Sequence, residues 1–85
     1  MSEYHICGVL VMTRPEQAPR VEQALSTMPG VELHANDAGR MVVTVEGDAY
    51  QGCADTITAL GSIEGVASSS LVYHQIESLP EEALQ

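Results

Sequence analysis

The apolar residues of the chain follow two different periods, and the two periods alternate along the sequence. Residues 4–13 are apolar at almost every position, a pattern typical of a central strand buried on both sides. Apolar residues then recur every three to four positions, which predicts a helix that ends at about Met28. Pro19 belongs in the first turn of a helix, so a start as late as Ala18 is allowed. The apolar stripe of this helix consists of Ala18, Val21, Leu25 and Met28.

A hairpin is predicted in the middle of the chain. Residues 31–35 alternate apolar and polar as an outer strand does, and residues 40–46 form the matching strand. Between them, Asn36-Asp37-Ala38-Gly39 is a turn signal. A last strand is predicted over Ser69–Gln75, because this stretch is rich in β-branched and aromatic residues and the chain carries no charge here until Glu77.

A second helix is predicted between the hairpin and the last strand. Asp48 and Gln51 have the spacing of a capping box, and Gly61 is a natural stop. The chain also repeats itself: residues 28–31 end the first helix and start a strand, and residues 63–66 do the same after the second. The apolar stripe of the second helix consists of Tyr50, Cys53, Ile57 and Leu60.

Two strand–helix–strand halves in a chain of 85 residues predict the order β-α-β-β-α-β. This is the ferredoxin-like split βαβ sandwich of the α+β class. Its four strands form one antiparallel sheet, and right-handed crossovers place both helices on the same face. We expect a single domain over residues 1–76, followed by a polar, flexible tail over residues 77–85.

The other face of this sheet is predicted to stay open. The more uniformly apolar parity of each strand is assigned to the helix side, namely Cys7, Val9, Val11, Met41, Val43 and Val45. In the last strand, Val66 should pack under the second helix. Unless a bulge intervenes, this leaves Ser69, Leu71 and Tyr73 open and turns Val72 and His74 to the helix side. The remaining open positions are Ile6, Gly8, Leu10, Met12, Val42, Thr44 and Glu46.

An open apolar sheet of this kind is typical of an interaction site. A peptide helix laid across the sheet and a strand added at an edge are the two available modes of peptide binding. Homodimerisation through the same face is the alternative that needs no partner. Gly8, in the middle of the first strand, is expected to mark close approach by another backbone.

The charge of the chain excludes some partners. Twelve carboxylates against Arg14, Arg20 and Arg40 give a formal net charge of -9. Three scattered cations cannot neutralise a run of phosphates, and an anionic membrane surface would repel the chain, so we expect neither nucleic acid nor membrane binding. The acidity favours a basic partner, although solubility alone also accounts for it. Residues 1–5 resemble neither a signal peptide nor a membrane span, so we expect a cytoplasmic location.

The residues capable of chemistry form no convincing catalytic or metal-binding pattern. Cys7 and Cys53 are interpreted as small core residues with free thiols. A metal site that also used His34 and His74 would rest on His5 and Cys7, two possible ligands two residues apart, and such a pair is a weak signal. No enzyme activity, metal or cofactor is therefore expected. His74 is expected to cap the last strand or contact a tail carboxylate.

Tyr73 has two alternative roles. An amphipathic ring on an open face is typical of recognition surfaces. Alternatively, the ring packs under the C-terminal tail with Ile76 and Leu79.

The chain resembles the NapD family over about residues 4–75. The most specific part is Ser70-Leu71-Val72-Tyr73-His74-Gln75 after Glu64-Gly65-Val66, supported by residues 7–11 and by Pro29-Gly30-Val31. The resemblance implies a cytoplasmic chaperone, without catalysis or cofactor, for maturation of the periplasmic nitrate reductase catalytic subunit. Such a chaperone binds the twin-arginine signal peptide of the enzyme precursor and prevents export until the molybdenum cofactor is inserted.

Together, the resemblance and the open face predict a set of peptide-binding residues in a monomer or weak homodimer. Gly8 and Ser69 stand where larger residues would enlarge the apolar face, so they affect the shape of the groove. The predicted peptide-binding residues are Ile6, Gly8, Leu10, Met12, Val42, Thr44, Glu46, Leu71 and Tyr73.

The alternative from another class is an ACT-like regulatory module that binds a small molecule as a dimer. It has the same fold, and fold alone does not separate the two functions. An obligate dimer that buries the open face and binds an amino acid would favour this alternative.

Overall fold

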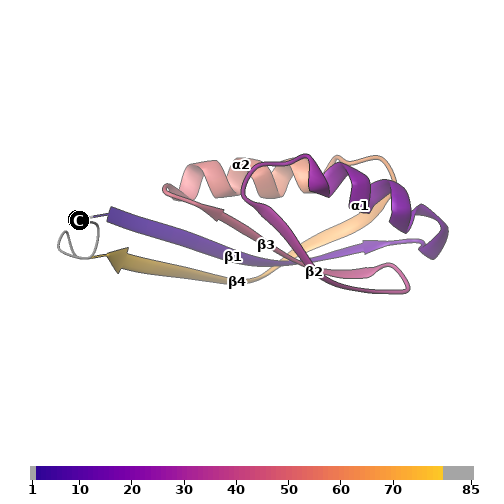
Figure 1. Cartoon of the computed structure of the whole chain (residues 1–85), viewed down its shortest axis with the longest axis horizontal. Helices are drawn as coiled ribbons and strands as arrows, with labels where there is room; N and C mark the ends of the chain where they lie inside the picture. Colours follow the sequence, from indigo (N-terminus) through magenta and orange to yellow (C-terminus); the bar gives the residue numbers. More distant parts are fainter. Residues whose placement is uncertain (1, 80–85) are drawn as a thin grey trace.

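The computed structural model describes residues 2–79 and has the predicted order of elements (Figure 1). Its sheet has four strands in the order β2-β3-β1-β4, each antiparallel to its neighbours, and both helices lie on one face (Figure 1). The ferredoxin-like α+β fold is therefore confirmed. The elements are β1 (Ser2–Thr13), a 3-10 turn (Pro15–Gln17), α1 (Ala18–Ser26), β2 (Val31–Asp37), β3 (Arg40–Gly47), α2 (Tyr50–Gly61) and β4 (Val66–Leu79).

The core lies between the helices and the covered face of the sheet. In α1 the buried residues are Ala18, Val21 and Leu25, as the apolar stripe predicts. In α2 they are Cys53 and Leu60, whereas Tyr50, at the start of the predicted stripe, is 48% exposed. Alternate residues of the two central strands complete the core, namely Cys7, Val9, Val11, Met41, Val43 and Val45. The predicted helix side of β1 and β3 is thus confirmed.

The first turn of α2 differs from the prediction. Its N-cap is Ala49, whose side chain has no oxygen to accept a hydrogen bond, and no side chain caps this end. Gln51 does not reach back toward Asp48, because its amide donates to Asp55 Oδ1 at 2.9 Å instead. The capping box is therefore wrong, and the helix starts without one.

The hairpin between β2 and β3 has the predicted turn. Ala38 and Gly39 both have positive φ angles, 52° and 95°, which suit a tight two-residue hairpin turn. Asn36 Oδ1 accepts a hydrogen bond from the backbone N–H of Gly39 at 3.1 Å. A Cβ atom at Gly39 would lie 2.3 Å from the carbonyl oxygen of Thr13, so only glycine fits there.

Pairing between β1 and β4 contains a bulge that changes which side chains share a face. Gly8 pairs with Tyr73 and Val9 pairs with Leu71, so the register skips Val72. Directly opposed residues of an antiparallel pair lie on the same face, which places Leu71 with buried Val9 on the helix side.

The bulge corrects three of the predicted placements in β4. Leu71 and Ser69 lie on the helix side rather than the open side, because they oppose Val9 and Val11. Val72 lines the open face instead of the helix side. Tyr73 on the open face and His74 on the helix side, opposite Cys7, agree with the prediction. The physical reason is that an extra residue in a strand inverts the parity of the residues beyond it. A second register shift, between Met12 and Thr13, restores the parity, so Val66 packs on the helix side as predicted and only the residues between the two shifts are inverted.

Beyond the sheet, β1 and β4 continue as a two-stranded ribbon that projects past the helices (Figure 1). Pairing of β1 with β3 starts at His5, while Ser2–Tyr4 pair with Glu77–Leu79 of β4. The predicted tail is therefore corrected for residues 77–79, which are strand, and residues 80–85 lie outside the described part of the chain. The predicted strand ends at Gln75, before the charged residue Glu77, but pairing of Glu77 with Tyr4 of β1 carries the strand past it.

Candidate functional site

An apolar groove lies at the centre of the open face. It has a volume of about 170 Å³ and its lining carries almost no polar surface. Val42, Val72 and Tyr73 are 49%, 65% and 47% exposed, which is unusual for apolar side chains at the middle of a sheet. The residues that line the groove are Gly8, Val9, Leu10, Val42, Val72 and Tyr73.

The Tyr73 ring packs directly against the backbone of Gly8. A Cβ atom at Gly8 would lie 2.1 Å from Tyr73 Cε1 and 2.5 Å from Cδ1. The ring therefore occupies the space that any other side chain at residue 8 would need. The predicted close approach at Gly8 exists, but the approaching group is a side chain and not a backbone.

The alternative role of Tyr73, packing with Ile76, does not fit this geometry. Ile76 pairs with His5, two strand positions from the pair of Cys7 and His74, so it lies on the helix side and Tyr73 on the other. The side chain of Leu79 lies outside the described part of the structure. Among the described residues Tyr73 is 47% exposed on the open face, and its packing under the rest of the tail concerns residues outside them.

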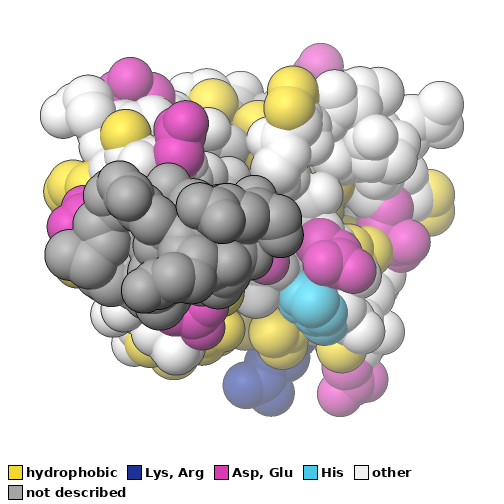
Figure 2. Space-filling view, turned by 60° about the vertical axis from the view of Figure 1, so that its left-hand side comes forward, with side chains coloured by type: hydrophobic (Ala, Val, Ile, Leu, Met, Phe, Trp, Pro, Cys, Tyr) yellow, Lys and Arg dark blue, Asp and Glu magenta, His cyan; other side chains and the backbone are white. Residues whose placement is uncertain are grey.

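Carboxylates lie at one end of the open face. Tyr4 Oη donates a hydrogen bond to Glu46 Oε2 at 2.9 Å, and this bond is the main reason that the pKa of Tyr4 is raised. Glu46 pairs with Ile6, and Glu77 pairs with Tyr4, so both share the face of the groove. Acidic side chains are spread among apolar ones over this end of the molecule (Figure 2).

The structure gathers the predicted binding residues, with one exception. Strand register places Ile6, Gly8, Leu10 and Met12 of β1 beside open residues of β3. Leu71 is the exception, and Val72 takes its place in the groove. Thr44 is on the open face but its hydroxyl is engaged, at 2.7 Å from His34 Nε2. The remaining predicted residues on this face are Val42, Glu46 and Tyr73.

Sequence reasoning missed Tyr4, Val72 and Glu77 as open-face residues. For Tyr4, the signal was present, because it shares the parity of Ile6. For Val72, strand parity predicted the helix side, because the bulge that places it on the open face depends on pairing with a strand more than sixty residues away. For Glu77, the charge suggested a strand end.

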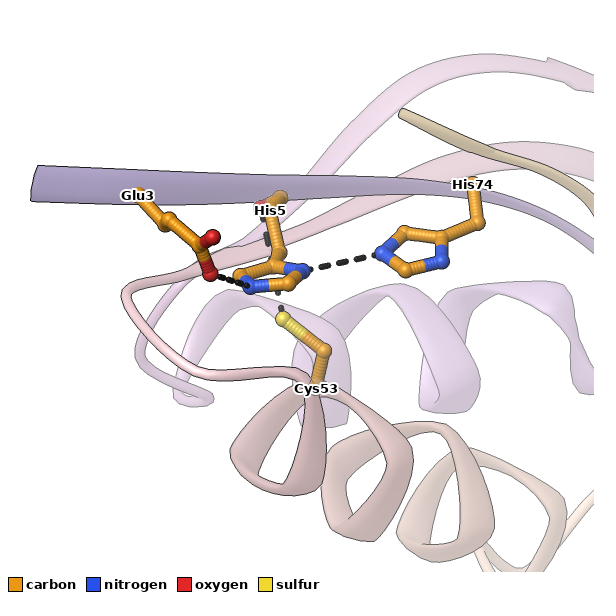
Figure 3. A network of polar contacts seen from close by, with 4 residues as sticks. All are labelled: Glu3, His5, Cys53 and His74. Atoms are coloured by element: carbon orange, nitrogen blue, oxygen red, sulfur yellow. Dashed lines mark hydrogen bonds and ion pairs between the residues drawn. The ribbon is translucent and has the colours of Figure 1, made fainter. Parts of the chain in front are cut away.

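A histidine pair joins β1 and β4 on the helix side (Figure 3). His5 Nδ1 and His74 Nε2 are 3.0 Å apart, and His5 Nε2 is 3.6 Å from Glu3 Oε1. The Tyr50 ring of α2 lies over the pair, with its centroid 4.8 Å from that of His74. His74 therefore contacts His5 rather than acting as a strand cap. Among the described residues, no group of three His, Cys, Asp or Glu side chains is placed so that it could hold a metal ion.

Both cysteines are buried and free, as predicted. Burial raises the pKa of the Cys7 thiol and of the Cys53 thiol. Cys53 Sγ lies 4.0 Å from the carbonyl oxygen of His5 (Figure 3). A neutral, enclosed thiol is a poor nucleophile, so these residues serve as core.

The fold and the open face define a class: a small ferredoxin-like protein with one face of its sheet uncovered and partly apolar. None of the helices in the described part of the chain has the length and apolarity needed to cross a membrane. The family model described as NapD protein matches residues 4–78, so the chain belongs to the NapD family. The resemblance found in the sequence is thereby confirmed.

Individual relatives give the same result. Chaperone NapD of Escherichia coli (strain K12) is 32% identical over 83 residues, which cover 95% of each chain. Chaperone NapD of Paracoccus pantotrophus is 33% identical over 72 residues, covering 85% of this chain and 64% of that protein. These relatives are named chaperones, so the chain has a chaperone role and is not an enzyme.

Solved structures extend the comparison to the fold. The solution structure of the E. coli Tat proofreading chaperone protein NapD matches with a TM-score of 0.78 at 32% identity, covering 93% of this chain and 85% of that one. A hypothetical protein from Pyrococcus horikoshii matches with a TM-score of 0.68 at 20% identity, covering 92% of this chain and 94% of that one. The second match shows a shared fold alone.

Proposed function

We propose that this protein is a cytoplasmic chaperone that binds the twin-arginine signal peptide of the precursor of the periplasmic nitrate reductase catalytic subunit. Binding on the open face holds the precursor back from export until its cofactor is inserted. The observation that carries the proposal is the apolar groove, with Val42 and Val72 about half exposed or more at the centre of the sheet. Membership of the NapD family supports the same function.

Apolar contact supplies most of the binding free energy in this proposal. Ordering a flexible peptide costs about 2–5 kcal/mol. At about 25 cal/mol per Å², burial of about 200 Å² of apolar surface offsets the upper figure. An exposed ion pair contributes only about 0–1 kcal/mol, so charge mainly orients the peptide and steers its approach.

Two adjacent residues of β4 provide a matched test. Val72 and Leu71 are both apolar and 65% and 48% exposed, but the bulge places Val72 on the open face and Leu71 on the helix side. Calorimetry with the precursor's leader peptide should show binding by the unchanged protein, at least tenfold weaker binding by Val72→Asp, and near-normal binding by Leu71→Asp. A tenfold loss corresponds to about 1.4 kcal/mol, less than the ~1.5–3 kcal/mol gained by burying a valine.

The same titration separates the competing functions. Absence of leader binding by the unchanged protein, or equal losses in the two variants, would overturn the proposal. Sedimentation should give a monomer or weak homodimer with the groove accessible. An obligate dimer that buries Val72 and binds an amino acid, but no leader, would instead support the ACT-like alternative.

A further inference from the structure

We infer that the leader peptide binds in a single direction, with its basic segment over Tyr4, Glu46 and Glu77 and its apolar segment over Leu10 and Val42. This inference rests on the proposed function and adds a direction to it. It follows from the uneven distribution of charge along the open face, which strand register defines.

One end of the open face is acidic. Glu46 pairs with Ile6 and Glu77 pairs with Tyr4, while Glu32 of β2 pairs with Thr44. We call Glu46 and Glu77 the carboxylate end, and Glu32 lies next to it on the edge strand, level with Gly8. In antiparallel pairs, opposed residues share a face, so all three carboxylates lie on the side of the groove. A guanidinium is favoured there by the combined negative potential.

The other end of the open face has no such excess. Arg40 pairs with Met12 of β1 on one side and with Asp37 of β2 on the other. The two charges offset each other, so a guanidinium gains no net attraction at this end. A peptide laid down in the reverse direction would therefore lose the attraction of the carboxylate end.

Tyr4 is a positioning residue within the carboxylate end. Its hydroxyl donates to Glu46 Oε2 at 2.9 Å, which restrains the Glu46 side chain. A carboxylate accepts about four hydrogen bonds, so Glu46 still has acceptor capacity for a peptide guanidinium. Restraining the carboxylate before binding reduces the entropy lost when the ion pair forms.

The spacing along the sheet suits a peptide whose basic and apolar segments are contiguous. Ile6, opposite Glu46, and Leu10, opposite Val42, are four residues apart in β1. At about 3.3 Å per residue this is about 13 Å, which about nine residues of helix span at 1.5 Å each. A leader with a basic head and an apolar body therefore reaches both ends of the groove at once.

Paramagnetic labels on the peptide measure the direction. A nitroxide before the arginines should broaden the backbone amide signals of Tyr4 and Glu46 in the ¹⁵N-labelled protein. A nitroxide after the apolar segment should broaden those of Met12 and Val42. The reverse pattern, or equal broadening at both ends, would overturn the single direction. Labelling the peptide leaves Cys7 and Cys53 of the protein untouched.

Calorimetry of the same samples separates this inference from the proposed function. If the peptide does not bind, both fail. If it binds and Val72→Asp weakens binding, but the label patterns are reversed or mixed, only the direction fails.

Charge variants supply the second measurement. Glu46→Gln should weaken leader binding about three- to fivefold, and Tyr4→Phe about twofold, in line with exposed ion pairs. Glu16→Gln, on an exposed residue of the 3-10 turn away from the groove, is the matched control and should change nothing. With a peptide whose arginines are glutamines, the losses from Glu46→Gln and Tyr4→Phe should disappear. Persistence of either loss would show a merely structural role and contradict the assignment of that residue.

Discussion

The two faces of the same sheet use the same kind of residue for opposite purposes. Met41 and Val43 of β3 are fully buried under the helices, whereas Val42 between them is 49% exposed on the open face. A single step along the strand thus separates a residue that stabilises the fold from one that is available to a partner. In a domain this small, leaving apolar surface uncovered lowers stability, which supports the proposal that the open face binds a partner.

The largest expected effect tests this difference directly. Met41→Ala removes a fully buried side chain and should lower the free energy of unfolding by about 2–5 kcal/mol. Val42→Ala, next to it, should change stability by only about 0.5 kcal/mol, because its side chain already contacts water. Urea unfolding of both variants measures the contrast, and similar losses in the two would refute the assignment of the faces.

A smaller effect is expected where the open face is most closely packed. Gly8→Ala places a Cβ atom 2.1 Å from the Tyr73 ring, so the ring must move, at a cost of about 1 kcal/mol for a partly exposed group. In a Tyr73→Ala background the same change should be neutral or stabilising by about 0.4–1 kcal/mol, because alanine restricts the unfolded chain. A double-mutant cycle of unfolding free energies measures this coupling. Equal costs in both backgrounds would contradict the contact.

The smallest effect is the pH dependence that the two buried thiols of the covered face contribute to stability. Burial raises the pKa of Cys7 and Cys53 above the ordinary value of 9.0, so the folded state binds their protons more tightly than the unfolded state does. Their contribution to stability is complete below that value and is lost as the pH rises through the folded pKa. Stability measured by urea unfolding should therefore fall above about pH 9.

Two controls isolate the cysteine contribution. The double variant Cys7→Ala, Cys53→Ala should show a shallower decline at high pH than the unchanged protein, and an identical decline would contradict the role of burial. In Val42→Cys, a thiol reagent should modify the new open-face cysteine rapidly while the two buried thiols react only as the protein unfolds. Fast modification of all three would show that the covered face is not closed.

The agreement between sequence and structure depends on whether a feature is local. Period-two patterning over residues 40–46 correctly separated Met41, Val43 and Val45 from the residues between them. The turn at Ala38 and Gly39 could be predicted from the sequence, because Asn36 supplies a side-chain acceptor and glycine suits the positive φ angle that such a turn needs. Such features follow from neighbouring residues, and any fold that uses the segment must respect them.

Apart from Tyr4, the contacts and placements that were missed are set by a distant partner. Nothing around Val72 marks a bulge, and the skip arises only when β4 is aligned with β1. The approach of Tyr73 to Gly8 and the contact of His74 with His5 likewise join residues that are far apart in the chain. The capping box at Asp48 shows that a local signal can be present without being used. Packing of Cys53 and Leu60 places α2 without a cap.

By itself, the sequence determined the order of the elements, the covered parity of the central strands, the free thiols in the core and the family. The tertiary structure decided which residues of β4 reach the groove, how Glu46 is held by Tyr4, and that Glu77 joins the open face. The physical reason is that hydrophobic periodicity acts within a segment, whereas register is a property of two segments together. Moving a strand by one residue inverts its faces without changing its pattern.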